Sequence, residues 1–147
     1  MNQNIVKTLG ILFLVAGTAF SVSFYDQVHI SLDMSIWFKP QYYTQFIPLF
    51  IAVTSVIAGL FVLYGYQHCN IYLVLFGHAA VEDVLFNWLG WSTTNQTTTS
   101  ITFFLPLGVL ALVLGYINSL DKKPISMLEA MAGLFFTTIL IMSPNLF

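Results

Sequence analysis

Four polar side chains, His78, Glu82, Asp83 and Asn87, lie within an apolar stretch of membrane length. On a helix, His78 and Glu82 share one face because they are four residues apart, and Asp83 and Asn87 share a second face for the same reason. An imidazole and a carboxylate on one face could hold a metal ion together or pass a proton between them. The alternative for both pairs is a structural role. The carboxylate of Glu82 could fix the imidazole of His78, or the side chains could bond neighbouring helices.

An acid inside the hydrocarbon is costly, about 3 kcal/mol at the centre of a helix. A helix with two polar faces cannot present a wide face to lipid. We therefore expect this helix to be the most enclosed of the chain, with at least one of Glu82 and Asp83 paired with another helix. Hydroxyl groups of other apolar segments are candidate partners: Tyr64, Tyr116, Thr18, Ser21 and Ser55.

A second set of metal-ligand types is Asp26, His29 and Asp33, at spacings of three and four residues. If the preceding helix continued through them, they would share one face. Such a set could bind copper, zinc, iron or manganese at the membrane boundary, or it could be three solvated residues at a helix end. Any bound ion should use this set or His78 with Glu82, and should not depend on Cys69 alone. One cysteine also excludes an intrachain disulfide and a multi-cysteine cluster.

The composition is that of a membrane protein. Hydrophobic residues make up 58% of the 147 residues and charged residues 7%, whereas a soluble domain has about 25% charged residues. The net charge of −2 and the absence of arginine give no indication of a nucleic-acid partner. We predict one transmembrane domain over residues 1–147, with membrane lipid and other membrane subunits as partners.

Windows without charge predict five transmembrane helices, and hence an all-α polytopic bundle. They are Thr8–Tyr25, Phe46–Tyr66, Ile71–Trp91, Ile101–Leu120 and Met127–Met142. Ser126 and Glu129 have the spacing of a capping box, which predicts where the last helix begins. The alternative is four spans plus one buried or re-entrant helix.

The connection Asp26–Gln45 is too apolar to extend into water. We predict that it lies at the membrane surface, with Trp37, Tyr42 and Tyr43 at headgroup level. Pro40 is suited to the first turn of a short helix that leads into the second span.

The lysines predict the topology. With five spans, Lys7 and the pair Lys122 and Lys123 fall on one side and Lys39 on the other. The positive-inside rule then places the N-terminus in the cytoplasm and the C-terminus outside the cell membrane. A glycosylation acceptor at residues 95–97 would be external.

Three short motifs carry a resemblance to a known family. They are Tyr25–His29 (Tyr-Asp-Gln-Val-His), Phe38–Tyr43 (Phe-Lys-Pro-Gln-Tyr-Tyr) and His78–Phe86 (His-Ala-Ala-Val-Glu-Asp-Val-Leu-Phe). Together they resemble the C subunit of the copper membrane monooxygenases, in particular the archaeal ammonia monooxygenase form. The resemblance implies a membrane subunit of a copper-dependent assembly that oxidises ammonia or methane, with copper as the cofactor.

The sequence departs from that family at its metal site. The family has Asp-x3-His, followed thirteen residues later by a second His. In this sequence only two residues separate Asp26 from His29, and the residue thirteen positions after His29 is Tyr42. A phenol cannot replace an imidazole as a neutral copper ligand. The resemblance therefore implies a divergent or accessory subunit.

Two other function classes remain open. One is a stand-alone membrane enzyme for a lipid or isoprenoid, since an intramembrane acid could protonate an alkene. The other is a proton or ion pathway, which requires ionisable groups across the bilayer.

Overall fold

The computed structural model describes residues 2–92, 94 and 97–146, and within them the chain is helical with no strand. The elements are α1 (Gln3–Tyr25), α2 (Met34–Trp37), the 3-10 helix η1 (Pro40–Phe46), α3 (Ile47–Leu63), α4 (Cys69–Trp88), α5 (Thr98–Tyr116) and α6 (Met127–Leu146). Five helical segments in this part of the chain are long and apolar enough to cross a membrane, with η1 and α3 acting as one. The predicted all-α, five-span architecture is confirmed.

Capping side chains set the helix ends more than hydropathy does. Asn2 accepts a hydrogen bond from the Asn4 amide, so α1 begins before Lys7 rather than after it. At α6 the predicted capping box is present. The Ser126 amide donates to Glu129 Oε2 at 2.8 Å, and the Glu129 amide donates to Ser126 Oγ at 3.2 Å.

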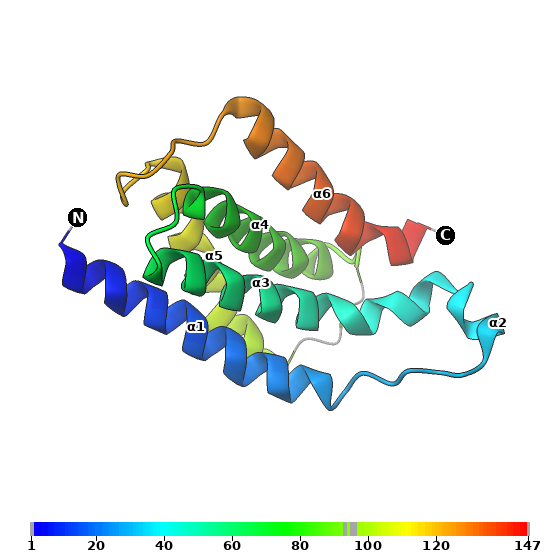
Figure 1. Cartoon of the computed structure of the whole chain (residues 1–147). Helices are drawn as coiled ribbons and strands as arrows, with labels where there is room; N and C mark the ends of the chain where they lie inside the picture. Colours follow the sequence, from blue (N-terminus) through cyan, green and yellow to red (C-terminus); the bar gives the residue numbers. More distant parts are fainter. Residues whose placement is uncertain (1, 93, 95–96, 147) are drawn as a thin grey trace.

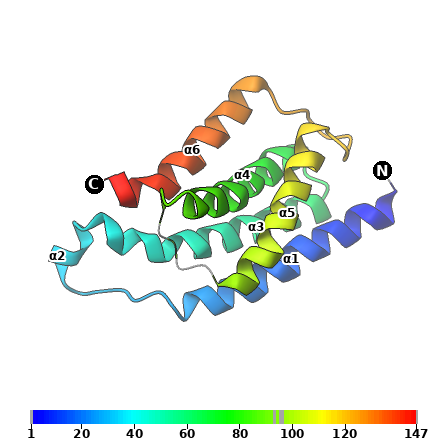
Figure 2. The ribbon, with the colours of Figure 1, turned by 180° about the vertical axis from the view of Figure 1, so that it is seen from behind.

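The helix α4 is the central element of the bundle. It packs against α3, α5 and α6, while α1 packs mainly against α3 (Figures 1 and 2). In the membrane-length stretch of α4, 56% of the residues are buried, compared with 50% for Gln41–Leu63 and 17% for α1 and α6. The prediction that the polar third span is the most enclosed helix is confirmed.

Glycines let two helix pairs approach closely. A Cβ on Gly59 of α3 would lie 2.6 Å from the backbone nitrogen of Leu14 on α1, and one on Gly77 of α4 would lie 2.8 Å from the carbonyl oxygen of Gly108 on α5. Neither position has room for any side chain. Such close backbone contact stabilises helix pairs in lipid, where van der Waals packing replaces the hydrophobic effect.

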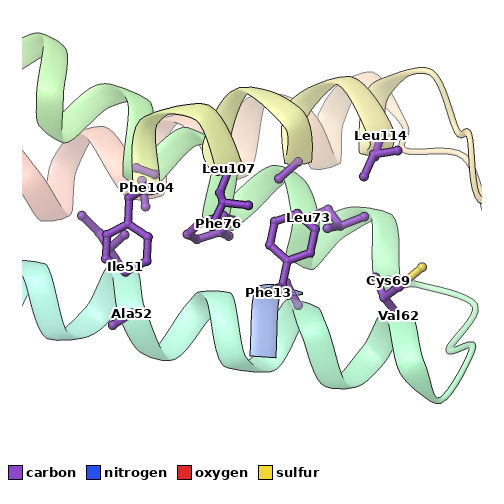
Figure 3. Close-up of a cluster of buried hydrophobic side chains, with 14 of the residues drawn as sticks. Phe13, Ile51, Ala52, Val62, Cys69, Leu73, Phe76, Phe104, Leu107 and Leu114 are labelled. Atoms are coloured by element: carbon purple, nitrogen blue, oxygen red, sulfur yellow. The ribbon is translucent and has the colours of Figure 1, made fainter. Parts of the chain in front are cut away.

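Three phenylalanines connect the glycine-packed pairs. Phe13 of α1, Phe76 of α4 and Phe104 of α5 are fully buried, and Phe76 makes edge-to-face contacts with the other two rings. Figure 3 shows them among the surrounding aliphatic side chains, including Ile51 and Leu73. This core holds α4 in place between α3 and α5.

The connection between α1 and α3 extends beyond the bundle (Figure 1). Pro40 stands in the first turn of η1, which runs directly into α3, as predicted. Large apolar side chains of this segment are exposed, among them Leu32 at 94% and Phe38 at 87%. Its location at the membrane surface stays a prediction.

Lys7 and Lys122 line the same pocket, so they lie at one end of the bundle as the lysine pattern requires. Which side of the membrane that end faces stays a prediction. Residues 95–96 of the predicted glycosylation acceptor lie outside the described part of the chain.

Candidate functional site

The carboxylate of Glu82 is paired across helices. Its Oε2 accepts hydrogen bonds from the hydroxyls of Thr137 and Thr138 on α6, each at 3.0 Å. The predicted pairing with another helix is confirmed, but these threonines are not among the expected partners. In the sequence these threonines cannot be told from ordinary helical threonines, whose hydroxyls bond carbonyls of their own helix. Thr137 also makes such bonds, to the carbonyls of Gly133 and Leu134.

His78 extends this contact towards α5. Its Nδ1 lies 3.2 Å from Glu82 Oε1, and its Nε2 lies 2.7 Å from the hydroxyl of Tyr116. Tyr116 was an expected partner of an acid, and it instead bonds the imidazole beside that acid. The result is a continuous polar chain from Tyr116 on α5 through His78 and Glu82 on α4 to α6.

Burial increases along this chain. Tyr116 is 48% exposed, whereas the side chains of His78 and Glu82 are only 14% and 8% exposed. Glu82 Oε1 is buried and makes no well-aligned hydrogen bond within the described part of the protein, although His78 Nδ1 is near it. A small rotation of the imidazole would therefore complete a hydrogen bond to the buried carboxylate.

Asp83 and Asn87 form a separate cluster on another face of α4, as their spacing predicts. Asp83 is fully buried, and its Oδ2 accepts a hydrogen bond of 3.2 Å from the hydroxyl of Thr94. The Asn87 amide donates to the hydroxyl and the carbonyl oxygen of the same Thr94, at 3.2 and 3.3 Å. A loop residue, rather than another helix, thus connects the two side chains.

The set Asp26, His29 and Asp33 does not lie on one helix, because α1 ends at Tyr25. Asp26 is the C-cap of α1, and the His29 amide donates to the side chain of Gln45. Asp33 caps α2. Its carboxylate accepts hydrogen bonds from Ser35, of which the bond from the backbone amide has the larger effect and that from the side chain the smaller, and these hold the pKa of Asp33 below its ordinary value.

Across the described residues, no three His, Cys, Asp or Glu side chains come together as a metal-binding group. A copper or other metal site at Asp26, His29 and Asp33, or at His78 and Glu82, stays a prediction. It would require further ligands from water or from another chain.

One buried polar residue gave no signal in the sequence beyond its place in the first turn of an apolar helix. Asn70 is fully buried, and its amide donates to Asn118 Oδ1 at 2.6 Å and to the Lys123 carbonyl oxygen at 3.0 Å. It attaches the connection between α5 and α6 to the start of α4.

Comparisons with protein-family models, curated protein sequences and solved structures find no match for this chain. The resemblance to the C subunit of the copper membrane monooxygenases stays a prediction from its three short motifs.

Proposed function

We propose that this integral membrane protein conducts protons along α4, with His78 and Glu82 as the groups that accept and release them. The observation that carries this proposal is the chain Tyr116–His78–Glu82, in which the imidazole contacts a hydroxyl with one nitrogen and a carboxylate with the other. Imidazole is the side chain best suited to such a relay, because it can take up a proton at one nitrogen and release one from the other.

The proton balance of the step is simple. A proton that arrives at Nε2 from the Tyr116 side makes the ring an imidazolium, and the proton on Nδ1 then passes to the Glu82 carboxylate. His78 is left neutral with its proton on Nε2, and Glu82 is left as a carboxylic acid. Before the transfer, the hydroxyls of Thr137 and Thr138 offset the loss of hydration of the buried carboxylate.

Polar contacts reach two adjacent residues of α4, Glu82 and Asp83, from opposite ends of the bundle, and the two side chains lie on different faces of the helix. Tyr116 is the last residue of α5 and approaches Glu82 through His78. Thr94 belongs to the connection at the other end of α4 and bonds Asp83. His78 itself is about 14 Å along the helix axis from Cys69, at 1.5 Å per residue. Tyr116 and His78 therefore lie on the way to Glu82 from one end of the bundle, and Asp83 is an ionisable group towards the other end.

We further propose that the chain works as a subunit of a larger membrane complex, as its sequence predicts. Only 17% of the membrane-length stretch of α1 and of α6 is buried, which leaves faces for lipid or for neighbouring subunits. Membership of a copper monooxygenase-like assembly rests on the sequence motifs alone. The proposed orientation in the cell membrane, with the N-terminus on the cytoplasmic side, rests on the lysine distribution.

Proton flux into liposomes tests the proposal. The purified chain is reconstituted around a pH-sensitive dye, and a potassium gradient with valinomycin drives proton entry. We expect Glu82→Gln to reduce the flux about a hundredfold, because an amide cannot accept the proton from His78. Glu129→Gln is the matched control, since Gln keeps the capping box and Glu129 lies outside the chain of contacts.

Flux equal to that of protein-free liposomes, or equal flux in wild type and Glu82→Gln, would contradict the proposal. In the first case, turnover of an added isoprenoid alkene by the same preparation would favour the enzyme alternative.

A further inference from the structure

The end of the bundle that carries the N-terminus contains a pocket of about 310 Å³ lined by two lysines. Lys7 comes from the second turn of α1, and Lys122 comes from the connection between α5 and α6. The last turn of α3 forms a further wall. Apolar side chains such as Val6 and Leu120 also line the pocket, so it combines a cationic part with an apolar part.

The two amines are available to a ligand. Lys123 is paired with Glu129 at 3.3 Å, but within the described chain Lys7 and Lys122 have no ion pair. No acidic side chain is among the residues that line the pocket, although Asp121 lies next to Lys122 in the sequence and is exposed. The Lys122 Nζ lies over the bare backbone of Gly65, 3.5 Å from the position that a Cβ would occupy there.

Hydrogen bonds, one of them from the buried Asn70, fix the segment that carries Lys122. The Lys122 amide donates to Asn118 Oδ1 at 3.0 Å, and that same oxygen accepts from the buried Asn70. The Lys123 amide donates to the carbonyl oxygen of Gln67 at 3.0 Å. The backbone beneath the amine is therefore ordered before any ligand arrives, which lowers the entropic cost of binding.

We propose that this pocket binds the phosphate of an anionic phospholipid, with Lys7 and Lys122 on either side of the phosphate and the upper acyl chain against the apolar wall. The chain contains no arginine, so lysines are its only strong phosphate-binding side chains. The pocket lies at one end of a bundle whose helices are long enough to cross a membrane, which is where headgroups are expected, and an apolar wall beside two amines fits a lipid better than a free ion. This site is separate from the proton pathway and does not depend on it.

Native mass spectrometry of the full chain tests the proposal. The protein is released from micelles containing equal amounts of phosphatidylglycerol and phosphatidylcholine, and the ratio of bound lipids is measured. We expect wild type to prefer phosphatidylglycerol, Lys7→Gln and Lys122→Gln each to lower the preference about fivefold, and the double variant about 25-fold. Lys39→Gln at the opposite end and the ion-paired Lys123→Gln are charge-matched controls and should keep the preference.

Two outcomes would overturn the assignment. One is an equal loss of preference in Lys39→Gln, which would mean that net charge rather than this pocket attracts the lipid. The other is full displacement of phosphatidylglycerol by millimolar inorganic phosphate, which would make the site one for a free anion. Unchanged thermal unfolding of each variant confirms that a lost preference reflects the missing amine.

Discussion

The hydroxyl of Thr138 on α6 donates a 3.0 Å hydrogen bond to the carboxylate of Glu82 on α4, across a sequence separation of 56 residues. Glu82 is the only acceptor within reach of that hydroxyl among the described residues, whereas the neighbouring Thr137 hydroxyl also has two backbone carbonyls within reach. The Thr138 bond is therefore the more specific attachment of α6 to the polar centre of the bundle.

Replacing Thr138 with Val should destabilise the protein by about 1.5–3 kcal/mol, because it removes a hydrogen bond to a buried carboxylate while keeping the side-chain shape. The free energy of unfolding in mixed detergent micelles measures the change. Thr102→Val is the control, since Thr102 on α5 bonds only a carbonyl of its own helix and should change the stability by less than about 0.5 kcal/mol. Equal losses in both variants would mean that the interhelical bond contributes nothing.

Replacing Tyr116 with Phe should slow proton flux about tenfold or more while leaving the unfolding transition nearly unchanged. The ring is kept, but His78 Nε2 loses the hydroxyl that lies 2.7 Å away. Tyr64→Phe is the matched control, because Tyr64 is 82% exposed and lies outside the chain of contacts. A flux of wild-type size in Tyr116→Phe would remove Tyr116 from the pathway.

Replacing Gly59 with Ala should destabilise the contact between α1 and α3 by about 1–3 kcal/mol. The added methyl group would lie 2.6 Å from the backbone of Leu14, and backbone cannot move aside as a flexible side chain can. At Gly133 on α6 nothing lies within 4 Å of the added carbon, so Gly133→Ala should instead stabilise the helix by up to about 1 kcal/mol. The free energy of unfolding of both variants should therefore change in opposite directions. A lower stability of Gly133→Ala would contradict the open space at that position.

The carboxyl of Asp33 should titrate below the ordinary Asp value of about 3.9. Its hydrogen bonds with Ser35 favour the charged form, so the folded-state pKa is lowered. The contribution of the cap to the stability of α2 is accordingly present above the unfolded-state pKa and is lost as the pH falls through the folded-state value. The pH dependence of the Ser35 amide shift in NMR spectra reports this midpoint. Asp33→Asn should abolish the titration, and a midpoint at or above 3.9 would show that the cap is absent in solution.

The sequence by itself determined the class of the protein and the polar faces of its central helix. Five apolar segments with few charges must be helices in a bilayer, because only internal hydrogen bonds satisfy the backbone there. The spacing of His78 with Glu82 and of Asp83 with Asn87 was sufficient to place each pair on its own face, since helix periodicity is a local property. The capping box of α6 was predictable for the same reason.

Only the tertiary structure decided what these faces contact. The sequence offered many hydroxyls as partners of Glu82, and the way α6 lies across α4 selected Thr137 and Thr138. Glycine contacts such as that of Gly77 with Gly108 determine which helices lie side by side, but glycine carries no side chain that would identify its partner. The end of α1 at Tyr25 separated the acids and the histidine that a longer helix would have aligned. Helix periodicity acts over a few residues, whereas these outcomes depend on the packing of segments that are far apart in the chain.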